Sequence, residues 1–275
     1  MTATTFAIAS RDELWLRGAL AESRLMHGQA LQRGDRIEAS DARDDRLLQL
    51  CDDAMAAARD AVLRDARVRV VVRATRENDV EAVETTMTIS IDGVSVVTTP
   101  PDAMHDYELL RAAIGIKPRE SAESLPIVWR NGSAAVLLHE AIGHANEHGA
   151  APVAWPDWLS VDAPLVPRRQ TFRDVPLPRM AHLIARQNGA PFAMPEERIE
   201  VQLIAGGAYD PVTDIVTIDV AVSTAGPLTI RRSRAQIAAS LIGALGEPVR
   251  YPGVICSREG QELYVASHAP VMITT

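Results

Sequence analysis

The sequence predicts an α+β protein, and three observations support this fold class. Two segments near the N-terminus, residues 11–33 and 46–65, have apolar residues at helical spacing. Two β-branched segments, residues 80–91 and 94–99, flank Asp92-Gly93, which is a strong hairpin signal. Helices and strands do not alternate as βα units, so a doubly wound parallel sheet is not expected.

Length and composition allow one large domain or two smaller ones in the 275 residues. We expect an N-terminal α+β region over residues 1–124 and a C-terminal domain over residues 125–275. The net charge of −8 argues against non-specific binding to nucleic acid or anionic membranes. No apolar run reaches 18 residues, and the first residues lack the features of a signal peptide, so the cytoplasm is the expected location.

In the N-terminal region, the first predicted helix has an apolar side formed by Leu14, Leu16, Leu20 and Leu25 or Met26. Residues 35–45 are rich in charge and indicate a solvated turn or helix end. The second helix has an apolar stripe that includes Leu47, Ala54 and Cys51, so this cysteine is expected to be a small core residue. Strand 68–75 then precedes the hairpin, and a short helix, 106–114, follows it.

Most of the C-terminal region is predicted to be antiparallel β-structure around one central helix. The remaining elements are strands over 199–205, 215–223 and 228–230, a turn over 206–211 and a helix over 234–245. Residues 150–167 are predicted to form a loop that contains Trp155 and Trp158. This loop is either pinned to the surface by half-buried indoles or a substrate lid, because binding residues gather on loops.

The central helix, residues 133–149, contains His139-Glu140-Ala141-Ile142-Gly143-His144. Imidazole nitrogens bind zinc, and a carboxylate beside the first ligand can take a proton from water. The two histidines are five residues apart, which separates them by roughly 140° on an ideal helix. A π-bulge would bring such a pair together, and Gly143 weakens the α-helix at this point. Surface histidines on an ordinary helix are the alternative.

Cys256 is the candidate third ligand, because thiolate is an excellent zinc donor and a catalytic site needs three protein ligands. On chemistry alone, a carboxylate from Glu147, Asp157 or Asp162 competes for this place. His148 could form a pair with His144 or serve as a fourth ligand. The arginines near residue 179, namely Arg168, Arg169, Arg173 and Arg179, could bind a peptide carboxylate or be structural.

Four passages, in order over residues 125–275, resemble the C-terminal metal-bearing part of the TldD/PmbA family of zinc metallopeptidases. Leu138 to His144, with Glu147 after it, resembles the family's His-Glu-x-x-x-His helix. The others are Pro178-Arg179-Met180, then Gly206-Gly207 with Asp210-Pro211, and finally Cys256 with Gly260, Gln261 and Pro270. The resemblance implies that His139, His144 and Cys256 bind zinc and that Glu140 is catalytic.

The chain also departs from the family. Family members are longer, with a large N-terminal domain, so this chain resembles a short variant. Ala181-His182 stands where the family has Thr-Asn, and residues 263–268 replace small residues and glycines. These differences concern substrate preference more than metal binding. The family forms heterodimers of catalytic subunits and metal-free partners, and because this chain keeps the motif it resembles the catalytic type.

The function predicted from the sequence is a zinc-dependent peptidase that cleaves peptide or other amide bonds. One alternative is a dedicated tailoring hydrolase that acts on a small amide natural product. Another is a non-catalytic subunit with structural zinc, which retention of Glu140 disfavours because a structural site needs no base. The expected partners are a peptide or small amide substrate and a second subunit, either a copy of this chain or a paralogue.

Overall fold

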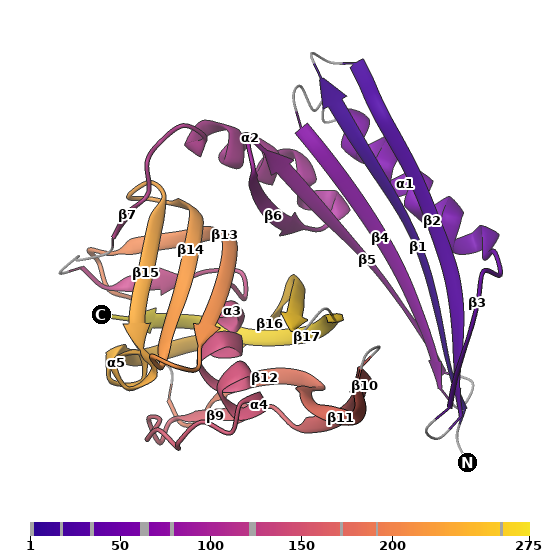
Figure 1. Cartoon of the computed structure of the whole chain (residues 1–275). Helices are drawn as coiled ribbons and strands as arrows, with labels where there is room; N and C mark the ends of the chain where they lie inside the picture. The colour runs from indigo at the N-terminus through magenta and orange to yellow at the C-terminus, as the bar shows by residue number, and fades with distance from the viewer. Residues whose placement is uncertain are drawn as a thin grey trace. The chain divides into compact units, whose positions relative to one another are not determined.

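The computed structural model describes residues 3–16, 19–33, 36–60, 66–77, 80–120, 125–170, 173–190, 192–258 and 261–275. The chain divides into two compact units, Met1–Ile114 and Gly115–Thr275. The division precedes residue 124, where the sequence suggested a boundary. Both units combine helices with sheets, so the α+β class is correct (Figure 1).

Unit 1 contains a six-stranded sheet in the order β3-β2-β1-β4-β5-β6, in which every neighbouring pair is antiparallel. Its strands are β1 (Ala3–Leu16), β2 (Ala19–Arg33), β3 (Arg36–Ser40), β4 (Ala66–Glu77), β5 (Val80–Ile91) and β6 (Val94–Thr98). Asp92 and Gly93 have φ of 49° and 83°, which is the left-handed backbone that a type I′ turn requires. The predicted hairpin is therefore confirmed.

The predicted helix over residues 11–33 is wrong, because this segment forms β1 and β2 (Figure 1). Its Ala, Leu, Glu, Arg and Gln residues favour helix locally, but β1 pairs with β4 along most of its length. Long-range pairing therefore overrides local propensity. The charge-rich segment 35–45 likewise contains β3, which adds an edge strand next to β2.

Helix α1 (Asp45–Asp60) covers one face of this sheet, as the apolar stripe predicted. Leu47, Cys51 and Met55 are fully buried, and the Cys51 thiol donates a hydrogen bond to the Ala9 carbonyl at 3.2 Å. Cys51 is therefore a core residue. A 3-10 turn at Pro100–Asp102 leads into α2 (Ala103–Ala113), which begins three residues earlier than expected.

Unit 2 contains a nine-stranded mixed sheet in the order β7-β15-β14-β13-β8-β17-β12-β9, with β16 also paired to β17. Most pairs are antiparallel, and the parallel ones are β7/β15, β8/β13 and β12/β17. The strands are β7 (Arg119–Glu120), β8 (Ile127–Trp129), β9 (Leu159–Asp162), β12 (His182–Gln187), β13 (Ile199–Asp210), β14 (Ile215–Ser223), β15 (Leu228–Ser233), β16 (Leu241–Arg258) and β17 (Gln261–Thr274).

A separate two-stranded sheet pairs β10 (Leu165–Gln170) with β11 (Arg173–Met180). Strands β9 and β10 thus occupy much of the segment predicted as a loop over 150–167. The predicted turn at 206–211 is also wrong in extent, because β13 continues to Asp210 and the turn lies at 211–214. The predicted helix 234–245 ends early, at Ser240 in α5 (Arg234–Ser240), since the chain from Leu241 onward pairs with β17.

Candidate metal centre

The helix that carries the histidines follows β8, a strand whose three residues are all buried. Ile127, Val128 and Trp129 of β8 are all buried between β13 and β17. Asn131 and Gly132, with φ of 52° and 74°, then turn the chain into α3 (Ala134–Leu138). A Cβ at Gly132 would lie 2.5 Å from the Val249 carbonyl oxygen, so only glycine fits here.

Residues His139–His144 form one turn of π-helix between α3 and α4 (Ala145–Glu147). This is the bulge that the five-residue spacing predicts. The two imidazole rings meet edge to face with centroids 4.8 Å apart. One ligand atom each from His139, Glu140 and His144 lie within 4.8 Å of one another, so these three residues form a cluster that could hold a metal ion.

Gly143 lets a second segment pack against this turn. A Cβ at Gly143 would lie 2.3 Å from Cε of the buried Met180, the last residue of β11. The thioether therefore occupies the space that any larger residue at position 143 would need. Part of the Pro178-Arg179-Met180 passage thus contacts the histidine helix directly.

His144 is oriented by a carboxylate one turn further along the helix. Its Nδ1 lies 3.0 Å from Oε2 of Glu147. Burial alone would raise the pKa of Glu147, but hydrogen bonds from His144 and from the Met180 amide lower it to about 2. An ionised carboxylate only accepts hydrogen bonds, so Nδ1 of His144 carries the proton. In a neutral imidazole this leaves Nε2, which lies 3.7 Å from Oε2 of Glu140, with its lone pair.

Glu147 is itself held by β11. Its Oε1 accepts a hydrogen bond from the Met180 amide at 2.7 Å and from Nε of Arg179 at 3.2 Å. The side chains of Glu147 and Arg179 are both 0% exposed. The carboxylate that the sequence left open as a ligand is therefore committed to supporting His144, with Oε2 on the imidazole and Oε1 on β11.

His139 is fully buried, and burial, together with the nearby His144, lowers its pKa to about 3. Its Nδ1 lies 3.5 Å from Oγ of Ser267, and that hydroxyl donates to the Val265 carbonyl at 3.3 Å. The Ser267 oxygen is thus available to accept from Nδ1–H. Among the described residues, no group forms a hydrogen bond with the buried Nε2 of His139, as expected of a nitrogen whose lone pair is available to bind a metal.

Glu140 projects into the same buried space. Burial raises its pKa to about 7, and its Oε2 forms no hydrogen bond with any part of the chain that the structure describes. A Cβ at Gly207 of β13 would lie 2.8 Å from Cγ of Glu140 and 3.1 Å from Cγ1 of Val136. Glycine at this position lets the strand approach the carboxylate closely, which gives the Gly206-Gly207 passage a physical role.

Among the described residues, the cluster that could hold a metal includes none of the other ligand candidates. Cys256 lies in β16 opposite Leu263, and its side chain is outside the described residues. Asp162 pairs with His182 at 3.0 Å, and the ring of His148 faces Tyr209 at 6.1 Å between centroids. Asp157 is exposed. The third ligand therefore stays a prediction, and the sequence analysis missed the supporting role of Ser267, which no motif indicated.

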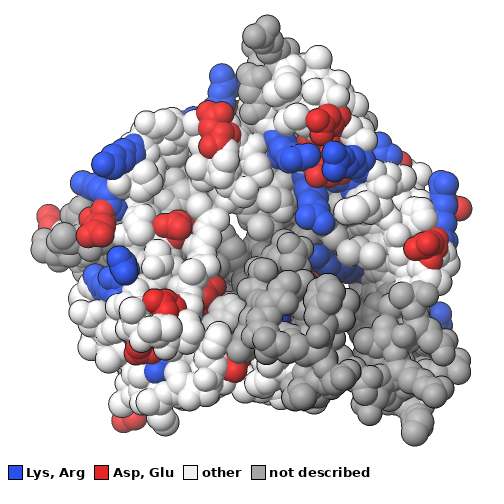
Figure 2. Space-filling model, viewed as in Figure 1, with Lys and Arg blue, Asp and Glu red and all other residues white. Residues whose placement is uncertain are grey.

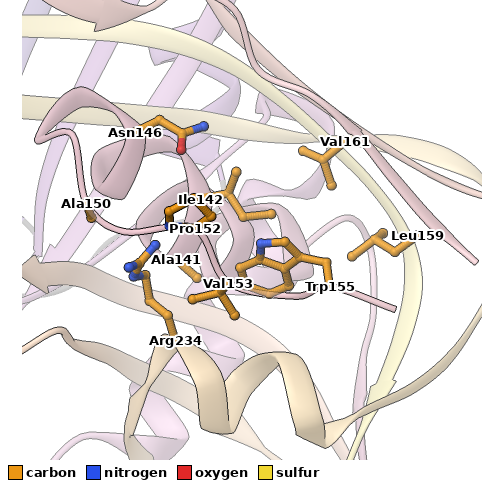
Figure 3. Close-up of a pocket in the computed structure, with 10 residues that line it drawn as sticks. All are labelled: Ala141, Ile142, Asn146, Ala150, Pro152, Val153, Trp155, Leu159, Val161 and Arg234. Carbon is orange, nitrogen blue, oxygen red and sulfur yellow. The ribbon is translucent and has the colours of Figure 1, made fainter. Parts of the chain in front are cut away.

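The loop with the tryptophans borders a cavity of about 330 Å³ on another side of the histidine helix (Figure 3). Its walls include Trp155, Ile142 and Val153, with the polar side chains of Asn146 and Arg234 at its margin. Trp158 instead packs on Phe192, with ring centroids 5.3 Å apart. His139, Glu140 and His144 are not among the described residues that line this cavity, so the lid interpretation of Trp155 stays a prediction.

On the face drawn in Figure 2, the described Lys and Arg side chains are interspersed with Asp and Glu. This mixture is in keeping with the net charge of −8. Within the described parts of the chain, no helix is both long and apolar enough to cross a membrane.

Comparison with solved structures gives two likenesses. TldE from Thermococcus kodakarensis aligns over 100% of this chain and 97% of its own, at 8% identity and a TM-score of 0.47. A candidate modulator of a DNA gyrase from Thermotoga maritima aligns over 100% and 96%, at 9% identity and a TM-score of 0.40. No protein-family model and no curated protein matches. The function is therefore inferred from the geometry of the cluster formed by His139, Glu140 and His144.

Proposed function

We propose that this protein is a zinc-dependent hydrolase that cleaves peptide bonds. The observation that carries the proposal is the cluster of His139, Glu140 and His144, in which the buried His139 Nε2 and Glu140 Oε2 form no hydrogen bond within the described residues. Such atoms are costly unless a ligand satisfies them. Two imidazoles and an adjacent carboxylate suit zinc better than the oxygen-seeking magnesium or calcium.

Metal binding and proton transfer would fall to different residues of this chain. His139 and His144 would hold the metal, and Cys256 is proposed as the third ligand. When bound, zinc would lower the pKa of a water molecule and polarise a carbonyl group. Glu140 would take up a proton at its carboxylate and return it to the leaving amine, because Oε2 lies 3.7 Å from Nε2 of His144, beside the proposed ligand atoms.

Glu140 also distinguishes this function from one alternative, the non-catalytic subunit. In a non-catalytic subunit with structural zinc, a buried carboxylate without partners would cost stability and serve no purpose. A tailoring hydrolase of a small amide would use the same residues and differ only in its substrate. We further propose a cytoplasmic location and assembly with a second subunit, either a copy of this chain or a paralogue.

The first prediction concerns the metal content of the purified protein. Protein purified without added metal should contain one zinc per chain, and added zinc should raise the melting temperature of chelator-treated protein, because a ligand stabilises the state that binds it. Elemental analysis and thermal unfolding measure the two effects. His139→Ala should abolish both, whereas His182→Ala, which alters a partly exposed pair with Asp162, should leave them unchanged. Magnesium, or no metal in a folded sample, would refute the zinc site.

The second prediction concerns Cys256, the proposed third zinc ligand. Cys256→Ser should lose most zinc affinity, because a hydroxyl is a far weaker zinc donor than thiolate. Cys51→Ser is the matched control, since this buried thiol contacts the Ala9 carbonyl in unit 1 and should leave zinc content unchanged. Zinc titration against a competing chelator measures both variants. Full affinity in the Cys256 variant would transfer the role to another residue.

A further inference from the structure

We propose that Glu147 is a positioning residue that fixes the tautomer of His144, and that the Arg179-Met180 segment sets metal affinity by holding Glu147. This inference rests on the proposed metal site and extends it to residues that do not touch the metal. It gives a specific task to the Pro178-Arg179-Met180 passage, which the sequence alone left unexplained.

The carboxylate of Glu147 accepts hydrogen bonds at both of its oxygens. Oε2 of Glu147 accepts from Nδ1 of His144 at 3.0 Å, and Oε1 accepts from the Met180 amide at 2.7 Å. Only a group with acceptors at both ends can satisfy both donors at once. While Oε2 holds the proton on Nδ1, the neutral imidazole presents Nε2 to the cluster in the form that binds a metal.

The carboxylate of Glu147 is held in place by two residues of β11. A buried carboxylate needs charge-assisted partners, and Arg179 provides one through Nε at 3.2 Å with both side chains 0% exposed. Met180 adds its amide and also packs its thioether against Gly143. Two consecutive residues of β11 therefore hold both the carboxylate and the turn of helix between the histidines.

The test is Glu147→Gln, which keeps the size of the side chain but replaces one acceptor with an NH₂ donor. That donor must face either Nδ1–H of His144 or the Met180 and Arg179 donors, so one side of the bridge fails in either orientation. Zinc affinity should fall about 10–100-fold. Asp162→Asn is the matched control, because it alters another carboxylate–histidine pair, with His182, and should leave zinc affinity unchanged.

Imidazole ¹⁵N NMR of the metal-free proteins separates positioning from a merely structural role. His144, assigned by comparison with His144→Gln, should carry its proton on Nδ1 in the wild type and lose this preference in Glu147→Gln. If wild-type protein bound no zinc, the proposed function would fail, and the tautomer comparison would still decide this inference.

Unchanged zinc affinity together with an unchanged tautomer in a folded Glu147→Gln variant would overturn the proposal. If this variant did not fold, Glu147→Asp would replace it, because its shorter carboxylate cannot span from His144 to the Met180 amide. Wild-type affinity in a folded Glu147→Asp protein would equally overturn the role assigned to the bridge.

Discussion

Glu140→Gln should keep its zinc and lose at least about 10²–10⁴-fold in turnover, which is the range typical of general base catalysis. The amide has nearly the size and shape of the carboxylate but cannot accept the proton. Neither supporting contact of the histidines involves Glu140, because His144 is held by Glu147 and His139 lies against Ser267. The metal site should therefore persist in the variant.

The same substitution should stabilise the metal-free protein at high pH. Glu140 has an ordinary pKa of 4.5, and burial raises the pKa in the folded state to about 7. Ionisation therefore opposes folding increasingly as pH rises from 4.5 through 7, and the difference between these pKa values corresponds to roughly 3 kcal/mol. Glutamine does not ionise, so the variant should gain stability near pH 8 and lose this advantage near pH 4.

Three measurements on one preparation decide between these roles: zinc content, urea unfolding with chelator at both pH values, and hydrolysis of an unstructured peptide library followed by mass spectrometry. Chelator-treated wild type is the control for hydrolysis. Wild-type turnover in the variant would remove Glu140 from the role of base. Loss of zinc would make Glu140 a ligand or its essential support, and the division of roles would have to change.

The cluster at the histidine helix could be predicted because its constraint is local. Two histidines five residues apart can share a ligand only if the helix is bulged, and Gly143 lies where a bulge is needed. The residues that complete the site are remote in sequence. Arg179 lies 32 residues after Glu147, and Ser267 lies 128 residues after His139. No spacing rule connects positions that meet only through the fold.

The same limit explains the errors in the N-terminal region. Leu20, Leu25 and Met26 suggested one face of a helix, yet in β2 they are 45%, 44% and 54% exposed. Strand β2 pairs with β1, and β1 also pairs with β4, which begins only at Ala66. Hydrophobic periodicity and helix propensity describe the conformation that a segment prefers by itself. Here, pairing with the distant β4 segment determined that residues 11–33 form strands.

Trp129→Ala should cost unit 2 about 3–5 kcal/mol, the range for truncating a large buried aromatic residue. Trp129 is 1% exposed in β8, between β13 and β17, and its indole N–H donates to Oγ1 of Thr274 at 3.1 Å. The substitution leaves a cavity at β8, the strand that leads into α3, and removes the hydrogen bond to the Thr274 hydroxyl in β17. Trp129→Phe should cost less, because it keeps most of the buried ring area.

Trp155→Ala is the matched control, because Trp155 is partly exposed and lines an existing cavity, so its truncation enlarges space that is already there. Urea unfolding and zinc titration should separate the two variants. Trp129→Ala should lower the unfolding midpoint more and also weaken zinc binding, since His139 follows Trp129 by only ten residues through α3. Equal stability of the two variants would show that β8 does not anchor the helix that presents the cluster.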